Sequence, residues 1–194
     1  MRYFLIAVLL AFVLSCVPYS EHPLTDPDPG KIDLSILGTW FWKDENESGF
    51  VHIGLDEKSR LLRLVMVDID KDGELEVSEY FGHTSSLDGK NYLNLKQVSP
   101  QELKPQGYIF VKYILKKNAF GVAIMNSDVI VKAIEDGTLK GKVEKSKMNY
   151  SIFITEEQTK LQQFIIKNDR LLFPEINYLT KLELQNNISH DKGK

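Results

Sequence analysis

Acidic side chains with the spacing of a metal-binding loop occur in the segment 68–79 of this 194-residue chain. Carboxylates stand at its first, third, fifth and last positions and a glycine stands at its sixth, in the residues Asp68, Asp70, Asp72, Glu79 and Gly73. Glu74 would add its main-chain carbonyl oxygen. Ca²⁺ is held by roughly six to eight such oxygens in a loop that bends sharply at a glycine. The spacing therefore indicates calcium binding as one interpretation of this segment.

The same spacing resembles the loop of EF-hand calcium-binding proteins, which lies between two helices. The residues after the loop do not favour a helix, because Gly82 is followed by Thr-Ser-Ser at 84–86 and by a turn pair at 88–89. Apolar and polar residues alternate over 74–81, as in a β-strand. No second loop of this kind occurs in the sequence. We therefore expect a β-hairpin with an acidic turn at 70–73 and no cofactor, with calcium binding as the alternative.

Two histidines, His52 and His83, fall within the predicted strands, and together with Glu79 they would be the material for an acid–base or metal cluster. Isolated histidines on strands are usually structural or exposed, so this cluster is a minor alternative. The chain contains no nucleophile elbow, zinc-protease helix motif, phosphate-binding glycine loop or dinucleotide-binding fingerprint. We therefore expect that the protein is not an enzyme.

Composition and charge narrow the class of protein. An apolar fraction of 43% with 26% charged residues is typical of a globular domain. The formal net charge of -3 does not favour nucleic-acid binding, which normally needs a basic surface. Cys16 is the only cysteine, so the domain forms no internal disulfide.

The first residues predict export. Arg2 precedes an uninterrupted apolar run at 4–14, which is shorter than the roughly 20 residues that a helix needs to cross a bilayer. A signal peptide at 1–15 is the better interpretation. A retained membrane segment, or a simple signal peptide followed by a chance cysteine, is the alternative.

The residues Val-Leu-Ser-Cys at 13–16 resemble the lipobox of bacterial lipoproteins, in which a small residue precedes the cysteine. The resemblance implies that Cys16 is acylated and anchors the protein to a membrane through several chains. Val17 stands where an aspartate would favour the inner membrane, so the resemblance implies the outer membrane, facing the periplasm. Four prolines within 17–30 disfavour regular structure and predict a semi-extended tether at 16–30.

Short alternating runs separated by turn residues predict antiparallel strands at 38–43, 49–55, 61–69, 74–84, 92–98, 108–116, 119–125, 150–154 and 179–184. Helices are predicted at 128–135, capped by Ser127, and at 156–168, opened by a capping box of Thr155 and Gln158. Consecutive antiparallel strands close into a barrel or fold into a two-layer sandwich. We therefore expect a mainly β domain at 31–185 with two short α-helices and a polar tail at 186–194.

The residues Leu-Gly-Thr-Trp at 37–40 resemble the Gly-x-Trp signature of lipocalin-like barrels. The resemblance implies that Gly38 permits a close turn and that Trp40 plugs the barrel floor, covered by a basic residue for which Lys181 is the candidate. The alternative is that Trp40 is an ordinary core residue of another β domain. A barrel of about eight strands has room for its own side chains or for one small ligand.

These features predict a non-catalytic, membrane-anchored lipoprotein of the bacterial envelope that binds a small apolar ligand or a partner protein. Its contact with the membrane would be the lipid on Cys16, and no nucleic-acid partner is expected. The alternative is a calcium-binding lipoprotein that uses the loop at 68–79.

Overall fold

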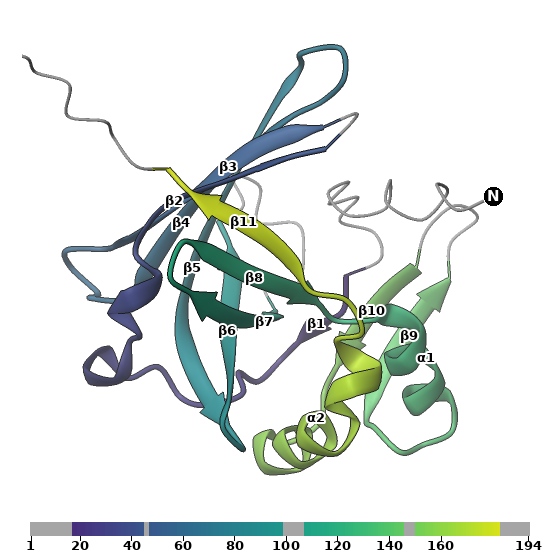
Figure 1. Ribbon diagram of the computed structural model, residues 1–194. Helices are drawn as coiled ribbons and strands as arrows, with labels where there is room; N and C mark the ends of the chain where they lie inside the picture. The colour runs from purple at the N-terminus through teal and green to yellow at the C-terminus, as the bar shows by residue number, and fades with distance from the viewer. Residues whose placement is uncertain (1–16, 45–46, 99–106, 146–149, 183–194) are drawn as a thin grey trace, which may run out of the picture.

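The chain forms a closed β-barrel with a smaller α/β layer on one side (Figure 1). This computed structural model describes residues 17–44, 47–98, 107–145 and 150–182. The predicted signal peptide at 1–15, Cys16 and the predicted tail at 186–194 lie outside the described residues. None of the described helices is both long enough and apolar enough to cross a membrane.

Eight antiparallel strands make the barrel, in the order β11-β2-β3-β4-β5-β6-β7-β8. The barrel closes because β11 pairs with both β2 and β8. The strands are β2 Gly38–Lys43, β3 Ser48–Leu55, β4 Leu62–Ile69, β5 Leu75–Leu87, β6 Lys90–Gln97, β7 Ile109–Lys116, β8 Ala119–Ile124 and β11 Asn177–Lys181. The predicted antiparallel barrel is thus confirmed, and the two-layer sandwich is wrong.

Alternation along the strands determines which side chains fill the barrel. In β4, Leu62 and Leu64 are buried while Arg63 between them is exposed. The inward residues of the eight strands form one core, whose largest members include Trp40, Trp42, Tyr80, Tyr113 and Phe120. Complete burial of a large apolar side chain contributes about 1.5–3 kcal/mol, so this core is a main source of the barrel's stability.

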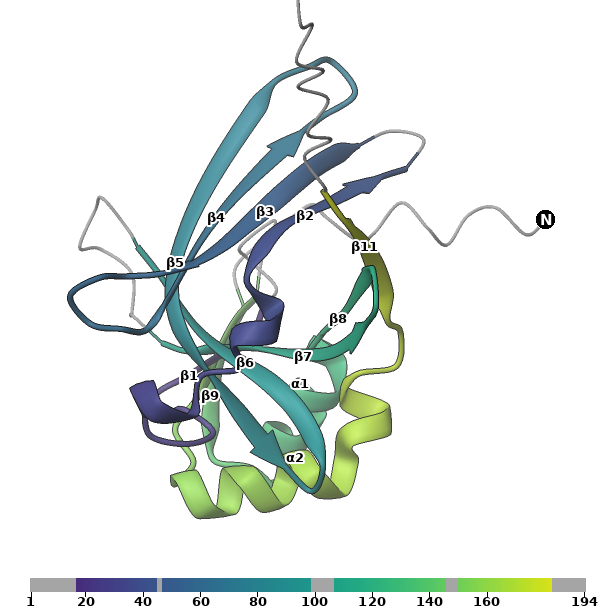
Figure 2. The same cartoon turned by 60° about the vertical axis from the view of Figure 1, so that its left-hand side comes forward.

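A second layer covers the outer wall of β5 to β8 (Figure 2). It consists of a small sheet in the order β1-β10-β9 and two helices, with bounds β1 Tyr19–Ser20, β9 Gly141–Lys145, β10 Tyr150–Ile154, α1 Ser127–Glu135 and α2 Gln158–Leu172. Ile152 of β10 and Leu161 of α2 share a buried cluster with Tyr92 and Phe110 of the barrel wall. The part of the wall around Tyr92 and Phe110 is therefore closed to solvent.

Both predicted helices are present, but their first residues differ from the prediction. Asn126, and not Ser127, caps α1, because its side chain accepts the N–H of Asp128. The predicted capping box at the start of α2 is wrong, since Glu157 is the N-cap and makes no side-chain capping bond. Glu156 is instead buried, and its carboxylate accepts the main-chain N–H of Lys140 at 3.0 Å. Tertiary packing thus decides where α2 begins.

The prediction of a tether at 16–30 needs correction for residues 17–30. We call residues 17–32 the N-terminal strap, because they are packed across the barrel and the second layer. Tyr19 and Ser20 form β1, which pairs in parallel with β10. The N–H of Ser20 donates to the carbonyl of Tyr108 at 2.8 Å, and Tyr108 returns the bond at 2.7 Å. Leu24 is fully buried.

Buried side chains of the barrel and α2 hold the strap in place. Asn94 Oδ1 accepts the N–H of Leu24 at 2.6 Å, and Gln162 Nε2 donates to the carbonyl of Leu24 at 2.5 Å. His83 Nε2 donates to the carbonyl of Thr25 at 2.6 Å. The prolines of the strap prevent a long ladder of backbone hydrogen bonds. The side chains of Asn94, Gln162 and His83 supply hydrogen-bond partners in its place. After the strap, a 3₁₀ turn, η2 Leu34–Ile36, leads into β2.

Candidate functional site

The predicted barrel signature lies at the end of the barrel next to the η2 turn. Gly38 has a φ of +131°, a conformation that other residues rarely adopt. Trp40 is buried, and its Nε1–H donates to the carbonyl of Ile36 at 2.8 Å. The Nζ of Lys181 lies 5.4 Å from the centre of the Trp40 ring. The structure therefore brings Gly38, Trp40 and Lys181 together, as the resemblance implied, and they plug this end with protein atoms.

The described interior of the barrel is filled by aromatic and aliphatic side chains. Trp40 packs on Phe120 with ring centres 5.2 Å apart, and Tyr113 packs on the same ring at 5.7 Å. Tyr113 also donates its hydroxyl to Asp33 Oδ2 at 2.8 Å, which fixes the residue that follows the strap against the barrel. A small barrel can be occupied by its own side chains in this way.

The segment 68–79 forms the β4–β5 hairpin that we expected as its main interpretation. Asp70 Oδ1 accepts the N–H groups of Asp72 at 2.8 Å and Glu74 at 2.9 Å. Gly73 has a φ of +82° at the bend. Asp70 is thus engaged in stabilising the turn itself.

Strand register separates the remaining residues of the calcium pattern. Asp68 pairs with Glu76 on the inner side of the strands, whereas Glu79 pairs with Val65 on the outer side. Glu79 Oε1 lies 2.5 Å from Nε of Arg63. Within the described ranges, no group of three or more His, Cys, Asp or Glu side chains is placed to hold a metal ion. These residues do not form an EF-hand, because strands and not helices flank the loop.

Asp68 has an unusual environment for a carboxylate. It is half-buried on the inner side of β4 and faces other acidic side chains. Burial, together with the nearby charges of Glu76 and Glu47, raises the pKa of Asp68 to about 6. Asp68 is therefore a group that gains or loses a proton close to neutral pH.

The two histidines are far from forming a catalytic pair with Glu79. His52 is exposed on β3, with Nδ1 2.9 Å from the hydroxyl of Thr39. His83 is buried beneath the strap, and burial lowers its pKa even though its bond to Thr25 opposes the shift. His52 and His83 therefore have separate structural surroundings.

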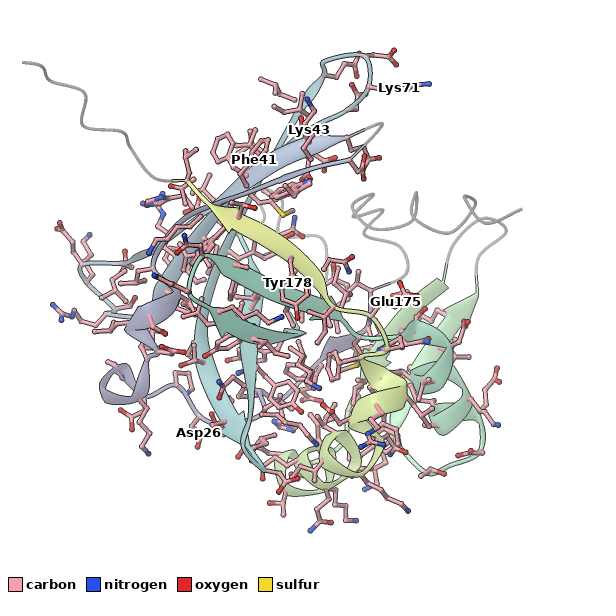
Figure 3. The ribbon with its side chains drawn as sticks, in the orientation of Figure 1. Asp26, Phe41, Lys43, Lys71, Glu175 and Tyr178 are labelled. Atoms are coloured by element: carbon pink, nitrogen blue, oxygen red, sulfur yellow. The ribbon has the colours of Figure 1, made fainter. Side chains whose placement is uncertain are left out.

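A feature that the sequence did not reveal is an apolar row on the outer wall, formed by Phe41, Phe50, Val67 and Val77. These residues are adjacent in register across β2, β3, β4 and β5. Phe41 is 38% exposed, Phe50 36% and Val77 63%. Figure 3 shows Phe41 on the outside of the wall. The row continues toward the hairpin with Leu75, which is 67% exposed.

The apolar row begins at Phe41, which pairs with Thr180 of β11, and runs onto the part of the wall where β2 to β5 project beyond the other strands (Figures 1 and 2). In β5, residues 75–78 pair with β4 alone among the described residues, because pairing with β6 begins at Tyr80. The projecting end carries more negative than positive side chains, namely Asp44, Glu47, Asp70, Asp72, Glu74 and Glu76 against Lys43 and Lys71. An exposed apolar surface next to an acidic end is thus the main accessible feature of this wall.

The sequence contained one signal for this surface. Phe41 stands between Trp40 and Trp42, so β2 is apolar on both faces. Such a strand is typical of a wall that is covered on both sides, but no described element covers the outer side of Phe41. Comparison with known proteins found no matching family model, no matching curated protein and no matching solved structure.

Proposed function

We propose that this chain is a lipid-anchored protein of the bacterial envelope whose barrel is a non-catalytic docking module for a partner protein. The apolar row carries the proposal for docking. Solvent-exposed aromatic and β-branched side chains in one contiguous row are characteristic of binding surfaces. The filled barrel core favours a partner on the outer wall over a small ligand inside.

The charges around the row indicate the chemistry of the partner. The acidic projecting end repels an anionic bilayer surface, so it disfavours insertion of this end into lipid. It favours a protein whose apolar patch is flanked by lysine or arginine. Opposite charges at the rim of an interface mainly accelerate association and make it sensitive to salt.

The lipid anchor is supported by the sequence alone, through the apolar run at 4–14 and the residues at 13–16. In a producing bacterium, we expect labelled palmitate to be incorporated into the wild-type protein and the protein to fractionate with membranes. Cys16→Ser should abolish labelling and leave the chain uncleaved. A mature wild-type protein with a free thiol would contradict the anchor.

Docking is tested with a photo-crosslinking residue at Phe50, and with the same residue at Ile114 as the control. Ile114 is similarly exposed, at 37%, but lies on β7 and outside the row. The protein that crosslinks through position 50 is then purified, and the Kd of its complex with the domain is measured. Phe41→Ser combined with Phe50→Ser should weaken binding by at least about tenfold, since the two side chains supply apolar burial.

The same double variant should keep the melting temperature close to wild type, because neither ring belongs to the buried core. Raising the salt concentration should slow association more than it accelerates dissociation. Equal binding by the double variant and the wild type, with both folded, would refute the proposed surface while leaving the anchor intact.

A further inference from the structure

A buried carboxylate joins α2 to the barrel at the edge of the second layer. Asp169 is 4% exposed. Its Oδ1 accepts the hydroxyl of Tyr92 at 2.8 Å, and its Oδ2 accepts Nζ of Lys112 at 2.7 Å. Burial opposes ionisation of Asp169, but the bonds from Lys112 and Tyr92 outweigh it and hold its pKa below the usual range. Lys112 and Tyr92 thus satisfy the negative charge.

Lys90 is close to the same carboxylate but is less well paired. Its Nζ lies 3.5 Å from Asp169 Oδ2 and 3.8 Å from Asp88 Oδ2. Neither distance is that of a good charge-assisted hydrogen bond, which is about 2.7–2.9 Å. The side chain of Lys90 is one third exposed, at 33%. Its ammonium group is therefore loosely paired and partly accessible on the barrel side of the junction.

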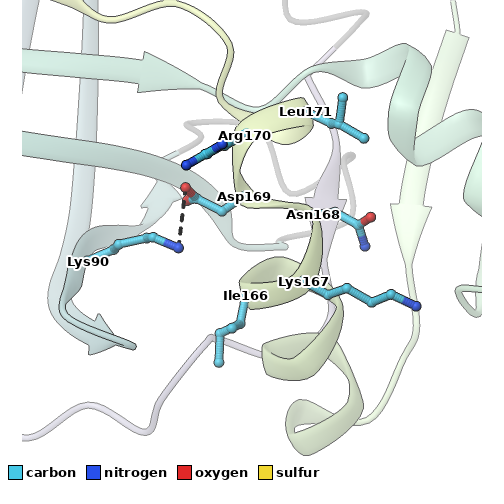
Figure 4. Close-up of a pocket in the computed structure, with 7 residues that line it drawn as sticks. All are labelled: Lys90, Ile166, Lys167, Asn168, Asp169, Arg170 and Leu171. Atoms are coloured by element: carbon cyan, nitrogen blue, oxygen red, sulfur yellow. Dashed lines mark ion pairs between the residues drawn. The ribbon is translucent and has the colours of Figure 1, made fainter.

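Lys90 and residues 166–171 of α2, which include Asp169, line a small open pocket of about 180 Å³ between β6 and the end of α2 (Figure 4). Figure 4 shows the guanidinium of Arg170 on the same side of α2 as Lys90, while Lys167 points away. In the part of the chain that the structure describes, Arg170 forms no ion pair.

The balance of charge at the pocket is positive. Lys112 offsets the charge of Asp169 and Asp88 is mostly exposed, so Lys90 and Arg170 remain as the two cations on this side of the pocket. The negative end of the helix dipole accounts for a cation near the C-terminus of α2, such as Arg170. It does not account for Lys90, which approaches from the barrel wall although Lys112 already offsets the charge of Asp169. The meeting of Lys90 and Arg170 at one open pocket is the observation that indicates an anionic ligand.

We propose that this pocket binds a phosphate group, with Lys90 and Arg170 as its direct ligands and Asp169 as a positioning residue that holds α2 and the lysines in place. Arg forms paired hydrogen bonds with phosphate oxygens, and Lys adds a mobile ammonium donor. The phosphate is either a free ion or ester, or the headgroup of a phospholipid. This site is independent of the apolar row.

The test uses the domain from residue 17 onward with inorganic phosphate, titrated by calorimetry at constant ionic strength. Lys90→Gln and Arg170→Gln should each weaken binding by roughly tenfold, as expected for the loss of one charge-assisted contact. Lys58→Gln removes the same charge from an exposed loop residue between β3 and β4 and should leave binding unchanged. Circular dichroism and the melting temperature confirm that each variant folds.

A second arm replaces inorganic phosphate with vesicles of phosphatidylglycerol, and with phosphatidylcholine vesicles as the neutral comparison. Binding to inorganic phosphate that depends on Lys90 and Arg170 supports a free phosphate ligand. Binding only to vesicles, with the same dependence, supports a lipid headgroup. Absence of binding in both arms, or equal binding by Lys90→Gln and Lys58→Gln, would overturn the site.

Discussion

The fold raises the pKa of Asp68 to about 6, which makes the effect of its ionisation on stability measurable near neutral pH. Register places it directly opposite Glu76 on the inner side of the projecting strands. Like charges in directly opposed positions destabilise a strand pair. Ionised Asp68 therefore lowers the stability of the folded protein at neutral pH, and its pKa of about 6 sets the pH range in which this effect develops.

We expect Asp68→Asn to stabilise the protein at pH 7.5. The pKa of Asp68 is higher in the folded chain, at about 6, than its ordinary value of 3.8, which applies when the chain is unfolded. The folded state then holds the extra proton between these values, so stability falls as the pH rises through this window. Because Asp68 is partly exposed, solvent screening limits the effect to about 1 kcal/mol at pH 7.5.

Urea denaturation at pH 4.5, 6 and 7.5 measures this effect as the difference between wild type and variant. The difference should be small at pH 4.5 and largest at pH 7.5. Asp72→Asn provides the matched control, since Asp72 is exposed in the turn. A variant that is less stable than wild type at pH 7.5 would mean that the ionised form is favoured in the folded state.

Calcium should leave the melting temperature of the domain unchanged, even at millimolar concentration after prior chelation. The reason is geometric, because Asp68 and Glu79 lie on opposite sides of the strands and Asp70 is engaged in the turn. A bound ion stabilises a fold by mass action. An increase of several degrees with calcium, absent with magnesium and lost in Glu79→Gln, would restore the alternative of a calcium site.

At the scale of elements, the strands were predictable because most have one buried side. All seven strands from β2 to β8 lie where alternation places them, within a few residues. β9 was missed because Lys142 and Glu144 make it read as a charged loop. β1 was missed because it has only two residues, and its pairing depends on contact with β10. Neither case carries a local signal, since tertiary contacts create the strand.

The strap is the element whose stability is most directly testable. We expect Asn94→Ala to destabilise it, because the variant leaves the N–H of Leu24 buried without its acceptor and also removes the bond to Ser85. Loss of one buried partner costs about 1–3 kcal/mol. Hydrogen exchange should show faster exchange at the amide of Leu24 than at amides of β3 and β4.

Asn91→Ala is the control on the same strand, because Asn91 is only partly buried and lies nearer the β5–β6 turn. It should leave the exchange rate of the Leu24 amide unchanged. If Asn94→Ala raises exchange uniformly over the whole barrel, the strap is part of the global folding unit. An unchanged rate at Leu24 in both variants would show that Asn94 does not hold the strap.

At the scale of the whole molecule, the barrel has one covered wall and one exposed wall. The sequence predicted antiparallel strands that close into a barrel or a sandwich, because alternation is local in the chain. The grouping of Gly38, Trp40 and Lys181 was implied by the lipocalin-like resemblance, since Trp40 and Lys181 are distant in sequence. The sequence did not predict the apolar row. Alternation shows which residues share a face of a strand, but it does not show which elements cover that face. The pocket at Lys90 was equally hidden, since β6 and α2 are distant in sequence and meet only after folding.

The docked strap has a mechanical consequence if Cys16 is acylated as proposed. Pro18 and Ser20 are buried in the folded domain. A chain spans at most about 3.5 Å per residue, so the linker between the lipid on Cys16 and the folded domain would be very short. The domain would then lie next to the bilayer surface in a restricted orientation, because it could not reorient freely about its anchor. It would then meet mainly partners that also lie close to the membrane, where a surface of low affinity is enough for binding.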